Sequence, residues 1–287
     1  MDFRLDRLAT LYLVSPLRRF LSDRGSSIPI LMYHNISEDD ESGVHGYYRT
    51  TTSPRVFAQQ MEYLHQEGYQ TYSLAQAVAQ LGVETGSVAK NVVITFDDGY
   101  RDFYRNAFPA LSRFGQTATM FLPTAYIGER SLEFKGKECM TWPEVRELQR
   151  YGILFGSHTV NHPQLSSLDR GTIEMELSVS KKTIEEKTGF AVDSFAYPYA
   201  FPQSNRDFRD MLRNLLDGAG YRNGVCTMVG RVGRQSEPLF MERLPINGLD
   251  DRALFQAKLA GGYDWVMWPQ SASKVFHATI QGIYRRN

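Results

Sequence analysis

Short apolar runs alternate with longer amphipathic stretches along most of this chain. Residues 92–96 (VVITF) form the clearest run, which is apolar at nearly every position, as expected of a strand buried on both faces. Residues 54–67 instead space their apolar side chains three and four apart behind a proline, the pattern of an amphipathic helix. Further apolar runs predict strands at residues 28–33, 69–72, 117–122, 153–156, 194–197, 224–228 and 240–246.

The stretches between these runs predict helices. One helix begins at residue 74, and the others cover residues 102–114, 142–151, 169–188 and 205–216. Strands that alternate with helices indicate a parallel sheet with right-handed crossovers. Roughly seven or eight such units favour a closed (β/α) barrel over an open doubly wound sheet. No Gly-rich GxGxxG loop follows a strand, which argues further against a nucleotide-binding sheet.

Composition and charge narrow the possible functions. Hydrophobic residues make up 42% of the 287 residues and charged residues 22%, which is enough apolar material for a large core and excludes bulk disorder. Lys+Arg and Asp+Glu both count 32, so no basic field attracts nucleic acid, and we expect no nucleic-acid partner. Cys139 and Cys226 fit no disulfide framework or metal motif and are expected to be reduced structural thiols.

The chain divides into a central domain and two flanking segments. We expect a barrel domain at residues 28–247, an N-terminal amphipathic helical segment at 1–27 and a C-terminal packing segment at 248–287. The longest apolar stretch near the N-terminus, residues 11–14, is too short for the core of a signal peptide, and no run is long enough for a transmembrane helix. We therefore predict a cytoplasmic protein whose N-terminal helix packs on the domain, with peripheral membrane contact through that helix as the alternative.

Polar residues follow four of the predicted strands. His34 follows the first, the pair Asp97 and Asp98 follows residues 92–96, the segment from His158 to His162 follows residues 153–156, and Tyr199 follows residues 194–197. In a parallel barrel the carboxyl ends of the strands meet on one face, where barrel active sites lie. These residues can therefore converge although they are far apart in sequence.

The carboxylates and histidines suggest a metal site. Asp-Asp-Gly after a strand is also an ordinary turn signal, and a single HxxxH pair is weak evidence for a ligand set. Combined, Asp98, His158 and His162 offer one carboxylate and two imidazoles, a ligand set that suits a catalytic zinc-like ion and leaves a position open for water. Asp97 would remain free as a base.

Three motifs resemble the polysaccharide deacetylase family, the metal-dependent carbohydrate esterases with a NodB homology domain. They are Thr-Phe-Asp-Asp-Gly-Tyr at 95–100, Ser-His-x-x-x-His at 157–162 and Phe-Ala-Tyr-Pro-Tyr at 195–199, in the family's order, and the likeness covers about residues 28–247. The resemblance implies a distorted (β/α) barrel, typically of seven strands. It makes Asp97 the general base, Asp98, His158 and His162 the ligands of one divalent ion, and the backbone N–H of Tyr199 part of the oxyanion hole. Zinc is the first expectation for the ion, with Co, Ni or Mn as alternatives.

The sequence departs from the usual family pattern in two places. An Arg normally precedes the Pro-Tyr element and orients the base; here Arg243 is the candidate for that role, although a surface ion pair with Glu242 would also explain it. A C-terminal His normally serves as the general acid, and the only late histidine is His277. Residues 29–35 (PILMYHN) resemble instead the permuted subgroup that acts on poly-N-acetylglucosamine, in which the acid precedes the Asp-Asp motif. We therefore predict His34 as the acid, with a core histidine as the alternative interpretation.

The predicted activity is hydrolysis of N-acetyl groups on an amino-sugar polysaccharide or oligosaccharide, such as an exopolysaccharide. The predicted partner is thus an N-acetylated carbohydrate, and Tyr33, Tyr100 and Tyr199 are candidates for stacking on sugar rings. One alternative is an amidase or O-acetyl esterase for a small or lipid-linked substrate, and another is an inactive carbohydrate-binding module. The sequence carries no feature that indicates an oligomeric state.

Overall fold

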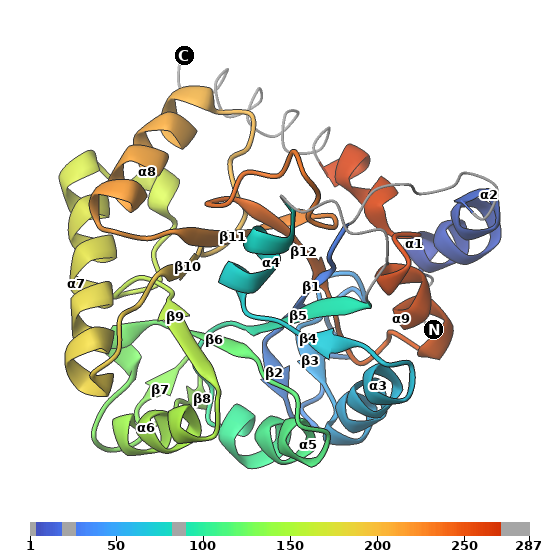
Figure 1. Ribbon diagram of the computed structural model, residues 1–287, viewed down its shortest axis with the longest axis horizontal. Helices are drawn as coiled ribbons and strands as arrows, with labels where there is room; N and C mark the ends of the chain where they lie inside the picture. Colours follow the sequence, from blue (N-terminus) through green and yellow to red (C-terminus); the bar gives the residue numbers. More distant parts are fainter. Residues whose placement is uncertain (1–3, 19–26, 82–89, 271–287) are drawn as a thin grey trace.

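The protein folds as a parallel barrel surrounded by helices, seen in a computed structural model that describes residues 4–18, 27–81 and 90–270 (Figure 1). Eight parallel strands follow one another in the order β1-β12-β11-β10-β9-β6-β5-β4, and β1 also pairs with β5. That pairing closes a barrel of seven strands and leaves β4 attached to β5 on its outer edge. The strands are β1 Ile30–Tyr33, β4 Gln70–Thr71, β5 Asn91–Phe96, β6 Thr119–Leu122, β9 Leu154–Ser157, β10 Ser194–Ala196, β11 Asn223–Val229 and β12 Met241–Pro245. The predicted closed barrel is confirmed.

Helices connect the strands and cover the outside of the barrel. They are α3 Pro54–Gln66, α4 Leu74–Leu81, the π-helical turn η2 Phe103–Ala107 with α5 Phe108–Arg113, α6 Trp142–Arg150, α7 Arg170–Thr188, α8 Arg206–Gly218 and α9 Arg252–Leu259. Local chemistry sets several ends: Ser53 caps α3 ahead of Pro54, Thr141 and Glu144 form a capping box on α6, and Gly189 ends α7 in the left-handed conformation.

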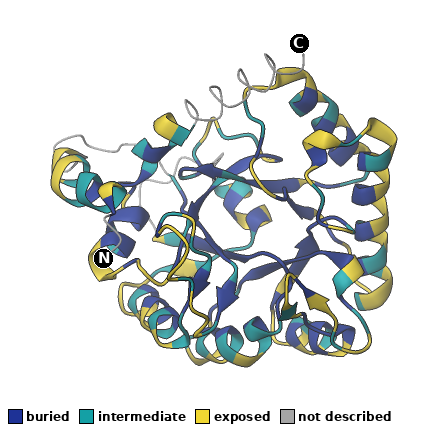
Figure 2. Cartoon of the chain, turned by 180° about the vertical axis from the view of Figure 1, so that it is seen from behind, coloured by how far each residue is buried: buried dark blue, intermediate teal, exposed yellow. Residues whose placement is uncertain are grey.

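Alternation along the strands separates two apolar cores. One fills the layer between barrel and helices, and the other fills the barrel itself, with Ile30, Val93 and Phe121 pointing inward. Leu74 and Ala77 of α4 belong to the inner core, so α4 plugs one end of the barrel, and it lies in the middle of the ring of strands in Figure 1. Most residues of the barrel strands are buried, whereas the outer faces of the helices carry many exposed residues (Figure 2). The opposite end of the barrel, at the carboxyl ends of the strands, is not filled by α4 and carries polar side chains.

Short elements that lack a repeating pattern were not predicted. They are the parallel pair β2 Asn35–Ile36 and β3 Thr51–Thr52, and the antiparallel hairpin β7 Glu133–Phe134 and β8 Lys137–Glu138. Strands of two residues are too short to show alternation. The main sequence signal for the hairpin is its turn pair, Lys135 and Gly136, which both have positive φ in the structure.

The described part of the N-terminal segment, residues 4–18, is largely helical and packs against the C-terminal segment. It consists of α1 Leu5–Leu8, the π-helical η1 Ala9–Val14 and α2 Ser15–Arg18. Arg7 pairs with Asp251 at 2.5 Å, and Trp265 donates a hydrogen bond to Thr10 at 3.0 Å. None of the described helices is long and apolar enough to span a bilayer.

Candidate metal centre and active site

The inward-facing positions of three strands continue past the strand ends into the site. Ile30 and Met32 of β1 lead to His34, Val93 and Thr95 of β5 lead to Asp97, and Gly156 of β9 leads to His158, because alternate residues point to the same face. These three polar side chains therefore gather inside the carboxyl end of the barrel, opposite the end that α4 plugs.

Asp98, His158 and His162 form one buried cluster whose candidate ligand atoms all lie within 4.8 Å of one another. Oδ1 of Asp98 lies 3.1 Å from Nε2 of His162 and 3.6 Å from Nε2 of His158. Burial would raise the pKa of Asp98, but its hydrogen bond to His162 and the charges around it hold the pKa well below the usual range. The carboxylate is therefore ionised and available to a cation.

The protonation of His158 is set for metal binding. Its Nδ1 lies 2.8 Å from the carbonyl oxygen of Ala196, which requires the proton on Nδ1 and leaves the lone pair of Nε2 facing Asp98. Burial lowers the pKa of His158 to about 4, so the ring is neutral at pH 7. The nearest side-chain atoms to the buried Oδ1 of Asp98 are the ring nitrogens of the two histidines, the arrangement expected of three ligands around one ion. One carboxylate and two imidazoles fit a divalent metal.

The backbone around this cluster adopts an uncommon conformation. In the described part of the chain, the non-glycine residues with positive φ all lie in or beside the site: Asp98 (72°), Lys135 (52°), Thr159 (68°), His162 (53°) and Tyr199 (59°). A left-handed conformation costs most residues about 1–2 kcal/mol, and such residues persist where the surrounding structure holds them, often at functional sites.

Arg243 of β12 holds Asp97. Both terminal nitrogens of the guanidinium donate to the two carboxylate oxygens of Asp97 at 2.8 Å, and Nε donates to the carbonyl of Cys226 at 3.0 Å. Arg243 is fully buried and makes no contact of this kind with Glu242, the alternative partner. Burial would raise the pKa of Asp97, but the charge and hydrogen bonds of Arg243, together with the neighbouring His158 and His34, keep the pKa below the ordinary value.

His34 lies beside Asp97 at the mouth of the site. Its Nε2 is 3.8 Å from Oδ2 of Asp97, and about a fifth of its side chain is exposed (21%). His34 is thus partly open to solvent, and its role as the acid stays a prediction. His277, the other candidate acid, lies outside the described residues.

Tyr199 lies at the rim, and its ring is half exposed. The ring packs edge-on against that of His162, with centroids 4.6 Å apart, and no hydrogen bond joins its backbone N–H to another described residue. Tyr33 does not fit its predicted contact with sugar rings, because its side chain is fully buried and its hydroxyl donates to Gln60 at 2.8 Å. Tyr100 is also largely buried but lines the pocket over the metal cluster, so its contact with a sugar stays a prediction.

A pocket of about 310 Å³ opens over these side chains and reveals residues that the sequence did not predict. Lys135, at the tip of the β7–β8 hairpin, places its Nζ 3.7 Å from Oδ2 of Asp98, and Lys137 lines the same pocket. Glu176 of α7 is buried beneath the loop that carries the two histidines. The glycine turn at 135–136 could have indicated the hairpin, but the position of the hairpin over the site depends on how the whole chain folds.

Comparisons with known proteins agree with this geometry. The family model for polysaccharide deacetylase matches residues 85–223, which includes Asp97, Asp98, His158 and His162. YxkH of Bacillus subtilis, whose name places it in the same family, is 28% identical over 226 residues, 79% of this chain and 74% of YxkH. The Streptococcus pyogenes deacetylase PplD, solved in complex with acetate, superimposes with a TM-score of 0.71 at 25% identity, over 82% of this chain and 99% of that one. This chain is therefore similar to the polysaccharide deacetylase family, in sequence over residues 85–223 and in fold over most of its length.

Two further relatives bear on the family's range. The poly-beta-1,6-N-acetyl-D-glucosamine N-deacetylase of Escherichia coli K12 is 30% identical over 141 residues, 46% of this chain but 20% of that protein. The enzyme of the same name from Staphylococcus aureus MSSA476 is 27% identical over 167 residues, 55% of each chain. The similarity thus spans only a part of both relatives.

Proposed function

We propose that this protein is a metal-dependent hydrolase that removes N-acetyl groups from an amino-sugar glycan. The observation that carries the proposal is the division of two adjacent carboxylates. Asp98 faces the two histidines, whereas Asp97 is gripped by Arg243 and lies beside His34. A site with one carboxylate for a cation and one for a proton is what hydrolysis of an amide requires.

Zinc is the ion that we propose for the cluster. His2Asp sets with an open position occur in catalytic zinc sites, and the fixed tautomer of His158 is typical of such a ligand. When bound, a divalent ion supplies a water molecule of lowered pKa and polarises the carbonyl of the acetamide. Co, Ni and Mn accept similar ligands and are the alternatives.

The remaining groups have separate parts in the reaction. The carboxylate of Asp97 takes a proton from the attacking water, and the backbone N–H of Tyr199 donates to the oxygen of the acetyl carbonyl as negative charge develops there. His34 donates a proton to the sugar nitrogen, because an amide ion would not leave unprotonated. Arg243 positions Asp97 through the two hydrogen bonds at 2.8 Å.

A glycan or glycoside that contains N-acetylglucosamine is the proposed class of substrate. The names of the relatives from E. coli and S. aureus support this, as does the likeness of residues 29–35 to the permuted subgroup. A cytoplasmic location also remains our proposal, and so does contact of the N-terminal helix with a membrane surface. The exposed side chains of Leu5, Tyr12 and Leu13 on that helix support the membrane contact.

The test combines metal content with acetate release. We expect the purified protein to hold one divalent ion and to release acetate from N-acetylglucosamine oligomers. Asp97→Asn should keep the ion and lose activity by orders of magnitude, whereas Asp98→Asn and His158→Ala should lose both. Acetate release only from O-acetyl esters would identify an esterase instead. A protein that binds the oligomers and ion without any turnover would be a carbohydrate-binding module.

A further inference from the structure

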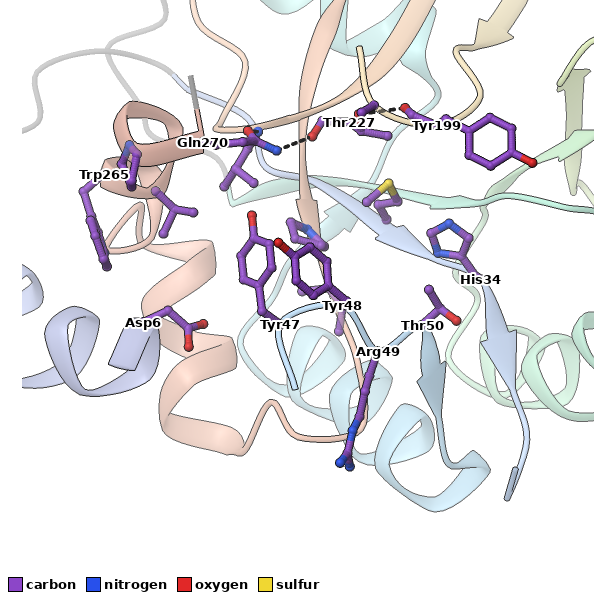
Figure 3. Close-up of a pocket in the computed structure, with 17 residues that line it drawn as sticks. Asp6, His34, Tyr47, Tyr48, Arg49, Thr50, Tyr199, Thr227, Trp265 and Gln270 are labelled. Atoms are coloured by element: carbon purple, nitrogen blue, oxygen red, sulfur yellow. Dashed lines mark hydrogen bonds between the residues drawn. The ribbon is translucent and has the colours of Figure 1, made fainter. Parts of the chain in front are cut away.

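A second pocket adjoins the metal centre. Its volume is about 590 Å³, within the range of about 300–1,000 Å³ for pockets that hold drug-sized ligands. Residues that line both pockets are Met32, His34, Thr50, Tyr199 and Thr227. Figure 3 shows His34 and Tyr199 at one end of this second pocket, and Trp265 and Asp6 at the other. A molecule bound at the metal centre can therefore extend into it.

The walls of the second pocket away from the metal are apolar and aromatic. They come from separate segments: Val229 from β11, Ile246 after β12, Trp265 from the 3-10 helix Asp264–Val266, and the rings of Tyr47 and Tyr48 from the loop before β3. Val229 and Ile246 are almost fully buried, so the shape of this wall is part of the folded core.

Apart from the hydroxyls of Tyr47 and Tyr48, the polar side chains at this end are bonded within the described part of the protein. The carboxylate of Asp6 accepts hydrogen bonds from Arg4 and from the hydroxyl of Tyr263, at 2.6 Å for the latter. The indole of Trp265 donates to Thr10, and the amide of Gln270 donates to the carbonyl of Thr227 at 2.9 Å.

Because these polar side chains already have hydrogen-bond partners, the wall favours a hydrocarbon chain over a sugar as its ligand. Sugar hydroxyls that left water for this wall would find few partners, which costs free energy. Hydrocarbon would gain about 25 cal/mol for each Å² that it buries. The polarity of the double pocket therefore falls from the metal centre outward, as suits a substrate with a polar head and an apolar tail.

The position of His34 indicates which part of the substrate carries the tail. His34 lines both pockets and, in the proposed mechanism, protonates the departing sugar nitrogen. The second pocket thus adjoins the position of the sugar nitrogen, where a tail carried by the sugar can enter it. Tyr199 also lines both pockets, so the N-octanoyl substrate below tests the acyl side. We infer that it binds a hydrocarbon chain attached to the sugar, so that the substrate is an amphiphilic N-acetylated glycoside. This inference rests on the proposed deacetylase function.

Four kinds of substrate test it. They are the methyl glycoside of N-acetylglucosamine, its octyl glycoside, N-acetylglucosamine oligomers and the methyl glycoside of N-octanoylglucosamine, all used below any critical micelle concentration. Burial of two methylene groups is worth about tenfold. We therefore expect kcat/KM for the octyl glycoside to exceed that for the methyl glycoside at least tenfold. A larger gain for the oligomers would overturn the inference in favour of a sugar subsite, and a larger gain for the N-octanoyl compound would place the chain on the acyl side.

A charge in the second pocket gives a matched comparison. Tyr48 and Tyr151 are both largely exposed (70% and 66%), but only Tyr48 lines this pocket. Tyr48→Glu should lower the octyl-to-methyl ratio of kcat/KM several-fold, whereas Tyr151→Glu should keep the wild-type ratio. Equal ratios in all three proteins would contradict the inference.

Binding of octyl glucoside, which has no acetamide, separates this inference from the proposed function. Calorimetry should show binding with a negative heat-capacity change that Tyr48→Glu weakens. If no N-acetyl glycoside is hydrolysed, the proposed function fails while this measurement still tests the pocket. Absence of binding to the wild-type protein would overturn the inference.

Discussion

Arg243 and Asp97 form a buried ion pair at the core of the site. Both side chains are almost fully shielded from water, and their two hydrogen bonds have the geometry of a bidentate guanidinium–carboxylate pair. Removal of one partner from such a pair is costly because the other charge stays buried without compensation. The pair therefore links the chemistry of the site to the stability of the fold.

A double-mutant cycle tests this link. Arg243→Met should lower the free energy of unfolding by about 3–5 kcal/mol, because it leaves the Asp97 carboxylate buried and unpaired. Asp97→Asn in the same chain removes that charge and should recover much of the loss. Urea unfolding of the metal-free proteins measures both. If the double variant is as unstable as the sum of the single ones, the two residues do not interact as described.

His34 and His277 are distinguished by the leaving group. Proton donation matters for an amine and little for an activated ester, because the ester's leaving group departs unaided. We expect His34→Ala to lower kcat/KM for an acetamide sugar by about 10²–10⁴, with a much smaller loss on an activated acetate ester. His277→Ala should keep both activities. Selective loss of the amide activity in His277→Ala would make that residue the acid instead.

Asp102 should make the stability of the protein depend on pH. Its Oδ2 accepts the N–H of Ile36 at 3.1 Å, while Oδ1 is buried without a partner among the described residues. Burial raises the pKa of Asp102 to about 6. Because the folded state holds the proton more tightly than the unfolded state, this group's contribution is fully present below about pH 4 and is lost as the pH rises toward 6.

Asp102→Asn should therefore stabilise the protein at pH 7–8 by up to about 3 kcal/mol, the equivalent of about two pKa units, and by much less near pH 4. The difference between variant and wild-type free energies of unfolding, measured from pH 4 to 8, checks this. Asp217→Asn, at an exposed carboxyl on α8, is the control and should change little at any pH. A difference that does not vary with pH would contradict the assignment.

Helix α7 supports the loop that carries both histidines. Oε2 of Glu176 accepts the backbone N–H groups of Val160 and Asn161 at 2.8 and 2.9 Å, and Oε1 accepts the side-chain amide of Asn161 at 2.7 Å. These bonds hold the backbone between His158 and His162, where Thr159 and His162 have positive φ. A buried carboxylate on a helix thus keeps two ligands at the right separation.

Glu176→Ala should weaken metal binding by about 10–100-fold, the usual cost of losing a group that orients a ligand. Glu174→Ala, an exposed glutamate on the same helix, is the matched control and should bind metal like the wild type. Competition with a chelator of known affinity measures both dissociation constants. Equal affinities would show that the loop holds its conformation without Glu176.

The strands and helices that bury many residues were predictable, because alternation and helical spacing are written over five or more positions, as at residues 92–96. The motifs likewise predicted the convergence of Asp98, His158 and His162. The ion pair between Arg243 and Asp97 was only one of two interpretations of the sequence. Which carboxylate Arg243 meets depends on the register of β12 against β1, where Leu31 lies opposite Leu244. Glu176 carries no local signal, and the glycine turn beside Lys135 indicates a hairpin but not its contact with Asp98, because both contacts arise from how α7 and the hairpin pack.

At the scale of the whole molecule, the two ends of the described chain meet beside the second pocket. Oδ2 of Asp250 accepts a hydrogen bond from Lys258 at 2.6 Å, and Oδ1 lies 3.4 Å from the guanidinium of Arg4. Arg4, Asp250 and Lys258 are all buried. Burial lowers the pKa of Lys258, and the charge of Asp250 opposes that shift. This network joins the N-terminal helix to α9.

Asp250 and its neighbour Asp251 allow a comparison at one point of the chain. Asp250→Asn should lower the free energy of unfolding by at least about 3 kcal/mol, because two buried cations lose their shared carboxylate. Asp251→Asn should cost less than about 1 kcal/mol, because its pair with Arg7 is exposed and an asparagine still caps α9. Urea unfolding at neutral pH measures both, and similar losses would contradict the role given to burial.

The same network positions Asp6 in the wall of the second pocket. Asp250→Asn should therefore also reduce the preference for the octyl glycoside, whereas Asp251→Asn should leave that preference unchanged. A loss of stability with the preference intact would show that the wall of the pocket holds its shape without this junction.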